Sequence, residues 1–231
     1  MEVIWDALRE ALRLLLTGDA ATWEIIGRSL RISGTATLLA FVFGLPIGAG
    51  LAFGRFRGRR LALATVNTGM GVPPIVVGLV VTIALWRSGP FGALGLLYTP
   101  TAMVIAQTAI ALPLVAGLSA AALQSVDPDF RIQMQAIGAG RWRSLLAVAV
   151  EARLPLLAAV MAGFGAVISE VGAALMVGGN IAGETRVLTT AAVLEASRGE
   201  FAFALALGII LLVLAFGVNL VLTTVQQRGA R

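Results

Sequence analysis

The stretch SEVGAALMVGGNIAGETRVLTTA, from Ser169 to Ala191, decides the fold class of this chain. It begins inside an apolar segment long enough to cross a membrane as a helix. It then passes through a glycine-rich bend and ends in a threonine-rich turn. It also carries Glu170, an acid where hydrocarbon is expected, and acids are costly enough at that depth to suggest a function. The stretch predicts a membrane-embedded helical protein with an acidic residue inside one of its spans.

The composition of the whole chain agrees with this prediction. Of its 231 residues 58% are hydrophobic and 13% are charged, and the mean hydropathy is +0.94. Soluble domains are about 25% charged. We therefore expect an all-α, polytopic integral membrane bundle. Its spans use nearly the whole length, which leaves no room for an added soluble domain.

The residue types that are missing exclude several functions. The chain has no His, no Cys and no Lys, so its 17 basic residues are all Arg. Without Lys it cannot form the phosphate-binding loop that hydrolyses ATP, and without His or Cys it lacks soft-metal ligands and the usual nucleophile–base pairs. We expect a chain that is not an enzyme and holds no metal or cofactor. The Arg residues form short clusters between apolar spans, which is typical of topology determinants rather than of nucleic-acid binding.

Uncharged windows predict the spans. After an N-terminal segment over residues 1–28, a transmembrane domain is expected over 29–231, with spans at about 32–54, 61–86, 101–123, 155–178 and 201–225. The loop from Arg55 to Arg60 and the segment from Arg131 to Arg153 are rich in Arg, and such loops stay cytoplasmic. This predicts a multi-pass membrane protein with its N-terminus outside and its C-terminus in the cytoplasm.

The first 28 residues do not have the pattern of a secretory signal, because they lack a basic start and an uninterrupted apolar core. Leu8, Leu12, Leu15 and Leu16 share one helical face, opposite a charged face. This pattern favours a helix lying in the membrane interface. Asp19 is then placed to cap the helix that follows.

The segment from Asp127 to Arg153, which we call the coupling knob, is too long for a simple connection. Asp127-Pro128 is a good helix start, and Gly138-Ala139-Gly140 is a good stop and bend. A second helix follows, in which Trp142 is part of an apolar surface. Two short helices joined at a glycine bend would project from the cytoplasmic face and could seat in a groove of a soluble partner.

Several of these motifs resemble those of one transporter family. Gly179-Asn180, Thr185-Arg186 and the run Leu188-Thr189-Thr190 are similar to the matching stretch of oxyanion ABC importer permeases, above all the tungstate permeases. Molybdate permeases are similar but typically have Glu-Phe-Gly where this chain has Glu170-Val171-Gly172. Pro73-Pro74 followed by Gly78 resembles the PPxVxG segment of the same group.

The resemblance gives the coupling knob a partner. Permeases of this family carry an EAA…G loop that docks on the ATP-binding subunit, and Gly138 and Ala139 match its glycine and the next residue. The chain departs from the pattern at Ile132-Gln133-Met134, which replaces Glu-Ala-Ala, and an ion pair to the ATPase is in doubt for that reason. The expected coupling residues are Gln133, Ala136, Gly138, Ala139, Arg141 and Trp142. The alternative is a tight interhelical turn with no partner.

The resemblance also implies a complete assembly. A second copy of the chain would complete the pathway across a two-fold axis. Cytoplasmic ABC subunits would bind ATP and Mg, and an extracytoplasmic oxyanion-binding protein would deliver the anion. The lipid of a prokaryotic inner or plasma membrane would surround the bundle. No cofactor is expected in the chain itself.

The expected translocation path or gate is built from neutral donors and helix breaks. An oxyanion needs hydrogen-bond donors along its way, but a strongly cationic site would trap it. Helix starts near Pro73-Pro74 and near Gly178-Gly179 could direct partial positive charge at the ion. The candidate residues are Pro73, Pro74, Ser169, Glu170, Gly172, Gly179, Asn180, Thr185, Arg186, Thr189 and Thr190.

Each of these candidates also has a purely structural alternative. A carboxylate repels an anion, so Glu170 is expected to hold a gate closed by pairing with Arg186 or with backbone donors across a dimer interface, or else to be a structural acid. The threonines could serve helix packing through their hydroxyls, and Pro73-Pro74 could be a simple kink.

Four functions remain in competition. The first is the permease of a tungstate importer, and the second is a molybdate, sulfate or phosphate importer of the same class. The third is a membrane scaffold that transports nothing. The fourth, an intramembrane enzyme, is disfavoured because Glu170 has no second interior carboxylate to work with.

Overall fold

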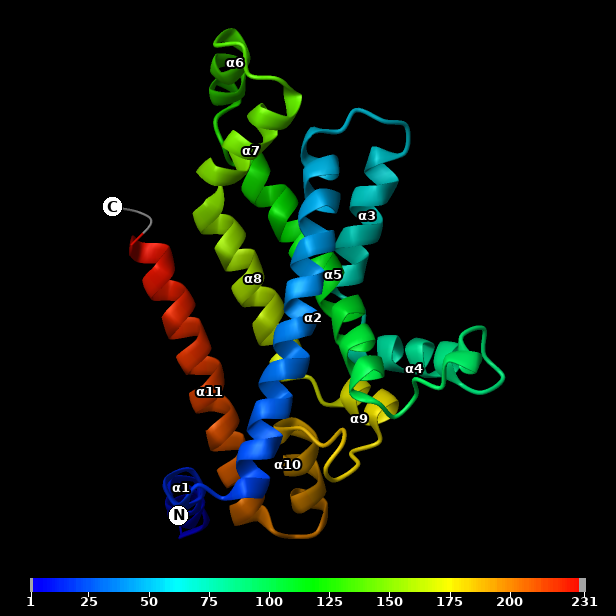
Figure 1. Cartoon of the computed structure of the whole chain (residues 1–231), viewed down its shortest axis with the longest axis vertical. Coiled ribbons are helices and arrows are strands. Elements are labelled where there is room, and N and C mark those ends of the chain that lie inside the picture. Colours follow the sequence, from blue (N-terminus) through cyan, green and yellow to red (C-terminus); the bar gives the residue numbers. More distant parts are fainter. Residues whose placement is uncertain (1, 229–231) are drawn as a thin grey trace.

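The computed structural model describes residues 2–228, and all regular elements in this range are helices (Figure 1). This confirms the expected all-α fold. The helices are α1 (Glu2–Thr17), α2 (Ala20–Phe53), α3 (Arg59–Met70), α4 (Pro74–Leu85), the 3-10 turn η1 (Gly92–Leu94), α5 (Pro100–Gln124), α6 (Pro128–Ala136), α7 (Arg141–Glu151), α8 (Arg153–Ile168), α9 (Gly172–Gly178), α10 (Leu188–Ser197) and α11 (Phe201–Arg228).

Three helices of the described chain are long and apolar enough to cross a membrane by themselves. They are α2, α5 and α11. Two bent pairs, α3 with α4 and α7 with α8, bring the number to five if each pair is counted as one span. The described helices therefore allow at most five crossings, which is the number expected from the sequence.

The centre of the bundle is the packing of α2 along α5, and α8 packs against both of these helices. Small residues allow the close approach of α2 and α5. A β-carbon added to Gly48 would come within 2.7 Å of the Ala116 carbonyl oxygen, and one added to Gly44 within 3.2 Å of the Ala116 nitrogen. Small residues four apart on one helix face are typical of membrane helix pairs, whose backbones they bring together.

The basic segments gather at one end of the molecule. The α2–α3 loop and the helices α6 and α7 lie at the upper end in Figure 1, and α11 runs toward this end. The helices α1, α9 and α10 lie at the opposite end. The loop from Arg55 to Arg60 and the coupling knob therefore face the same side, as their charges predict.

The expected span over 61–86 is not a straight crossing. The helices α3 and α4 meet at a bend of 102°, and α4 lies across the long axis of the bundle (Figure 1). The break falls at Gly71-Val72-Pro73, and α4 begins at Pro74, where the missing N–H costs nothing. The prediction of a helix start at Pro73-Pro74 is confirmed.

The expected span over 155–178 is also interrupted. The helix α8 ends at Ile168, and α9 begins only at Gly172. A helix start near Gly178-Gly179 was expected, and that expectation is wrong: α9 ends at Gly178, and Gly179 follows with a φ of +69°. Because the C-terminal end of a helix carries partial negative charge, this end does not attract an anion.

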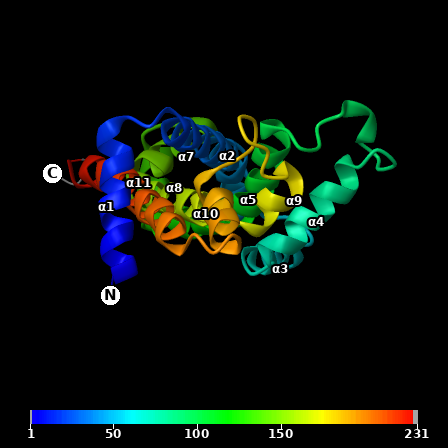
Figure 2. The same cartoon turned by 90° about the horizontal axis from the view of Figure 1, so that it is seen from below.

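The N-terminal segment forms the expected helix, but only over α1, and α2 already begins at Ala20 rather than near residue 32. Asp19 caps α2 by accepting hydrogen bonds from the Thr22 hydroxyl and backbone N–H, and these bonds lower the pKa of the Asp19 carboxyl. Figures 1 and 2 together show that α1 lies across the bundle axis.

The face of α1 that is buried against the bundle is made of two alanines and one leucine, and it is not the leucine face that was expected to lie in the membrane interface. Ala7, Ala11 and Leu14 are buried, and α1 packs on α11. Leu12 and Leu16 remain exposed. An exposed apolar face on a helix that lies across the bundle is the pattern of an interfacial helix.

Candidate functional site

The stretch from Ser169 to Ala191 folds back on itself, so that the break after α8 meets the start of α10. The Thr189 hydroxyl donates to the Glu170 carbonyl oxygen at 3.0 Å. The Asn180 side-chain amide donates to the Thr190 carbonyl oxygen at 3.3 Å. The structure therefore brings most of the predicted path residues into one cluster at the end of the bundle opposite the coupling knob (Figure 1).

Glu170 lies two residues before α9, which begins at Gly172, and its side chain caps the first turn of this helix. Its carboxylate accepts a hydrogen bond from the Ala173 backbone N–H at 2.9 Å, in the first turn of α9. A carboxylate is favourable at this position because the first N–H groups of a helix have no partner within the helix. Within the described residues of this single copy, no ion pair joins Glu170 to Arg186; the pairing expected across a dimer interface stays a prediction.

The threonine hydroxyls are committed to the backbone of the chain. Thr185 is fully buried; its hydroxyl donates to the Gly178 carbonyl oxygen at 2.5 Å and accepts from the Ile181 N–H at 2.9 Å. The Thr190 hydroxyl lies 3.1 Å from both the N–H and the carbonyl oxygen of Val187. In this conformation these hydroxyls shape the turn instead of lining a passage. Ser169 is exposed, and its hydroxyl donates to the Gly165 carbonyl oxygen at 2.8 Å.

Two polar groups of the turn remain without a partner. The Asn180 Oδ1 and the Arg186 Nε are shielded from solvent and make no hydrogen bond among the described residues. Arg186 donates through Nη2 to the Asn180 carbonyl oxygen at 3.4 Å. Unsatisfied buried polar groups are costly. The Asn180 Oδ1 and the Arg186 Nε–H are therefore an acceptor and a donor that a further group could satisfy.

The glycines of this region serve close packing. A β-carbon at Gly178 would lie 2.8 Å from the Met103 sulfur, and one at Gly179 would lie 2.8 Å from the Tyr98 ring. Pro73-Pro74 lies beside the same region, because α4 crosses α9. A β-carbon at Gly172 would lie 3.5 Å from Ile75, in the first turn of α4.

Sequence reasoning missed Arg28, which holds the turn in place. From α2, its guanidinium donates to the carbonyl oxygens of Gly183 at 2.7 Å and Arg186 at 2.9 Å, and it pairs with Glu24. Its side chain is only 11% exposed. The spacing of four residues between Glu24 and Arg28 was visible in the sequence, but the contact to residue 183 lies 155 residues away.

A second missed residue is Gln107, which is buried in the middle of α5. Its amide accepts from the Ser33 hydroxyl at 3.1 Å and donates to the Val167 carbonyl oxygen at 3.2 Å, one residue before α8 ends. It therefore connects α2, α5 and the break after α8. In the sequence, Gln107 could have been noticed as an amide side chain inside an otherwise apolar window, because polar groups within membrane spans are rare.

The coupling knob has the predicted local structure. Asp127 accepts from the Asp129 N–H at 2.8 Å at the start of α6. Gly138 has a φ of +82°, a conformation that favours glycine, and the Ala139 N–H donates to the Met134 carbonyl oxygen at 3.0 Å. Gln133, Ala136 and Arg141 are exposed.

The tip of the coupling knob presents an apolar surface. Trp142 is 81% exposed and Ile137 is 75% exposed. Burying a side chain of this size stabilises an association by about 1.5–3 kcal/mol. Exposed large apolar groups beside a rigid bend are suited to insertion into a groove of another protein.

Comparison with known proteins identifies the family. The sequence profile of the binding-protein-dependent transport system inner membrane component matches residues 44–230. The tungstate uptake system permease protein TupB of Peptoclostridium acidaminophilum is 38% identical over 227 residues, which cover 98% of this chain and 100% of that protein. A probable anion ABC transporter permease protein of Haloferax volcanii is 44% identical over 201 residues, covering 85% of this chain and 87% of that protein.

A solved structure has the same fold. An inward-facing structure of the MetNI methionine ABC transporter superposes with a TM-score of 0.76 at 19% sequence identity, covering 92% of this chain and 99% of the matched chain. The structural similarity and the profile match therefore agree. The chain is an integral, multi-pass membrane protein that belongs to the family of binding-protein-dependent transport system inner membrane components, the permease subunits that work with substrate-binding and ATP-binding partners.

Proposed function

We propose that this chain is the permease of an ATP-driven tungstate importer. The observation that carries the proposal is the 38% identity to a tungstate permease over nearly the full length of both chains. Among the described residues, the Ser169–Ala191 cluster offers an anion one free donor, the unpartnered Nε–H of Arg186. Beside it lie the neutral side chains of Asn180 and the threonines, whose hydroxyls bond to the backbone in this conformation. A path of this kind binds an oxyanion weakly enough to release it.

The proposed orientation places the coupling knob in the cytoplasm and the N-terminus outside. The Arg-rich loop and the coupling knob lie at one end, and α1 lies across the other (Figure 1). The knob seats on an ATP-binding subunit, which holds ATP and Mg and hydrolyses the nucleotide. The tungstate-binding protein approaches the end that carries α9 and α10.

The proposed transporter contains two copies of the chain, which together enclose the path. An exposed apolar face on α4 supports this arrangement. Val80 is 60% exposed and Ile83 is 59% exposed, on a helix that lies across the bundle axis beside α9. A second copy that covers this face would place the two Ser169–Ala191 clusters on opposite sides of one axis.

Reconstitution tests the proposal. The chain, its ATP-binding subunit and its binding protein are placed in vesicles, and uptake of tungstate is measured with molybdate and sulfate as competitors. We expect uptake to require ATP and to be inhibited by molybdate more than by sulfate. Accumulation of tungstate by the chain alone, or stronger inhibition by sulfate than by molybdate, would contradict the proposal.

Docking of the coupling knob has a separate test. Trp142→Ala removes an exposed side chain that contacts little of its own chain, so the melting temperature should stay within about 1 °C of the unmodified chain because surface changes shift stability by at most about 0.5 kcal/mol. Recovery of the ATP-binding subunit on affinity purification should fall at least about tenfold. Phe216→Ala, a similarly exposed aromatic on α11, is the control and should leave recovery unchanged. Equal recovery with both variants would remove Trp142 from the docking surface.

A further inference from the structure

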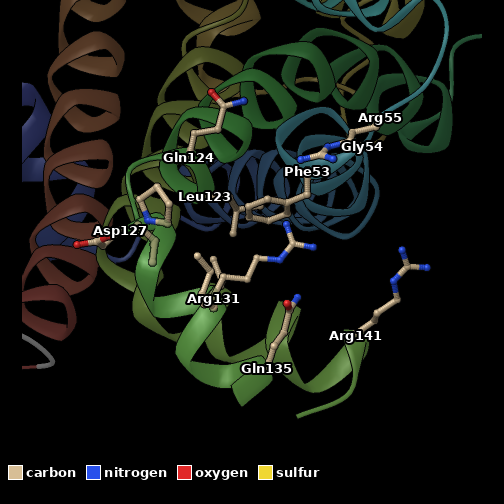
Figure 3. Close-up of a pocket in the computed structure, with 13 residues that line it drawn as sticks. Phe53, Gly54, Arg55, Leu123, Gln124, Asp127, Arg131, Gln135 and Arg141 are labelled. Atoms are coloured by element: carbon tan, nitrogen blue, oxygen red, sulfur yellow. The ribbon is translucent and has the colours of Figure 1, made fainter. Parts of the chain in front are cut away.

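A cavity at the basic end of the bundle has three arginine residues in its lining. It has a volume of about 780 Å³ and lies between the end of α2, the end of α5 and the coupling knob. Arg55, Arg131 and Arg141 reach it from three separate segments (Figure 3). Asp127 is the single acid of its lining, and Figure 3 shows that its side chain points away from the central space.

This cluster carries uncompensated positive charge. Arg stays protonated at every physiological pH. In the described part of the chain, the three guanidiniums form no ion pair, since the pairs found there join other residues. Like charges around one partly enclosed space repel one another and attract an anion. An adjoining cavity of about 670 Å³ adds Arg57 and Arg59 to the same basic region.

Arg131 has a hydrogen-bond donor that a bound anion would satisfy, and this observation is independent of the charge of the cluster. Its guanidinium carbon lies 4.8 Å from the centre of the Phe53 ring, which covers one face of the group. Its Nε is shielded from solvent and has no hydrogen-bond partner. An unpaired buried donor is costly, and a small rotation of the guanidinium would let one oxyanion accept from Nε and Nη together.

We infer that this cavity binds a compact, negatively charged tetrahedral group of the phosphate type. The planar fork of Arg matches the oxygen spacing of such a group, and the neutral amide of Gln135 offers a further donor. The bound anion links the α2–α3 loop to both helices of the coupling knob and thereby restrains the knob. The inference goes beyond the transport proposal and does not depend on it, because it requires only the residues of this cavity.

The same chemistry can come from free inorganic phosphate or from the headgroup of an anionic lipid. The full-length chain, purified in a neutral detergent, is therefore tested with radiolabelled inorganic phosphate by equilibrium dialysis. In parallel, the chain is placed in nanodiscs of phosphatidylglycerol or phosphatidylcholine, and native mass spectrometry counts the lipids that remain bound. Saturable binding in the first arm identifies a free anion, and selective retention of phosphatidylglycerol in the second identifies a lipid.

Three variants decide the result. Arg131→Gln and Arg55→Gln should each weaken the observed binding at least about tenfold, because charge-assisted hydrogen bonds are the strong class. Arg143→Gln removes the same charge from α7 at an exposed position that lines neither cavity, and it should bind as the unmodified chain does. Because Arg131 also stacks on Phe53, Arg55→Gln provides the test that does not disturb α6.

Hydrogen exchange gives a second readout. Anion binding should slow exchange at the amides of residues 128–141 in the unmodified chain and in Arg143→Gln, but not in Arg55→Gln. Absence of saturable binding in both arms, or an equal loss in Arg143→Gln, would overturn the inference. Either failure would leave ATP-dependent tungstate uptake untouched, so the two proposals fail separately.

Discussion

Gly78 of α4 lies directly against Ala173 of α9: a β-carbon added to Gly78 would come within 2.6 Å of the Ala173 Cα. This contact holds the crossed helix α4 against the short helix that follows Glu170. Any side chain at residue 78 must push the two backbones apart, because the atom it meets is not the end of a flexible side chain.

Gly78→Ala should therefore destabilise the fold by about 1–3 kcal/mol, the usual cost of overpacking. Gly165→Ala, in α8, is the matched control, because a β-carbon added there meets no atom of another described helix within 4 Å. This substitution should leave the stability unchanged or raise it by up to about 1 kcal/mol. Thermal unfolding of the two variants in the same detergent measures the difference. Equal melting temperatures would show that α4 is not held at this contact.

Glu170 is expected to act through its hydrogen bond to the start of α9 more than through its charge. Glu170→Gln keeps an acceptor for the Ala173 N–H, whereas Glu170→Ala removes it at a cost of about 0.5–2 kcal/mol. The alanine variant should unfold at lower temperature and transport more slowly, and the glutamine variant should stay close to the unmodified chain in stability. The ratio of tungstate to sulfate uptake should not change in either variant. A changed ratio in the glutamine variant would instead place Glu170 among the residues that select the ion.

Arg28 should control the mobility of the turn between α9 and α10. Lys cannot reproduce two hydrogen bonds in a planar fork, so Arg28→Lys should lose at least one bond to the carbonyl oxygens of Gly183 and Arg186. Hydrogen bonds to charged groups contribute about 1.5–3 kcal/mol, so exchange of the amides of residues 181–187 should speed up about tenfold or more. Arg31→Lys, at an exposed position one turn further along α2, provides the comparison and should leave these amides unchanged. Identical exchange in both variants would rule out the clamp.

Gly138 sets the bend of the coupling knob through its backbone and not through packing. A β-carbon there meets nothing within 4 Å, but its φ of +82° is unfavourable for other residues, by about 1–2 kcal/mol. Gly138→Val should reduce uptake while membrane insertion stays intact. Gly138→Asn, which tolerates this conformation better, should retain most of the uptake. ATP hydrolysis and tungstate uptake by the reconstituted complex are measured for both; full uptake with valine would show that the bend is not needed for coupling.

Local chemistry allowed much of the fold to be predicted from the sequence. The helix start at Asp127-Pro128, the stop at Gly138 and the beginning of α4 at Pro74 follow from residues that lie within one turn of each feature. The bounds of α5 and α11 follow from uncharged windows of membrane length. The break at Ser169–Val171 was not predicted; the Glu170 carbonyl oxygen inside it accepts from the hydroxyl of Thr189, 19 residues away, and such a long-range partner cannot be read from the local sequence.

The sequence by itself determined the class of protein: an apolar chain without Lys, His or Cys, with Arg clustered in alternate loops, forms a polytopic helical bundle and leaves the chemistry to partners. Only the tertiary structure decided how the polar groups are used. It turned the threonine hydroxyls of the candidate path toward backbone groups, brought Arg28 across 155 residues to hold the turn, and gathered three Arg residues around one cavity. The physical reason is that an uncharged apolar window is a property of one continuous segment. Hydrogen bonds and clusters of charge, in contrast, form between segments that only the packing brings together.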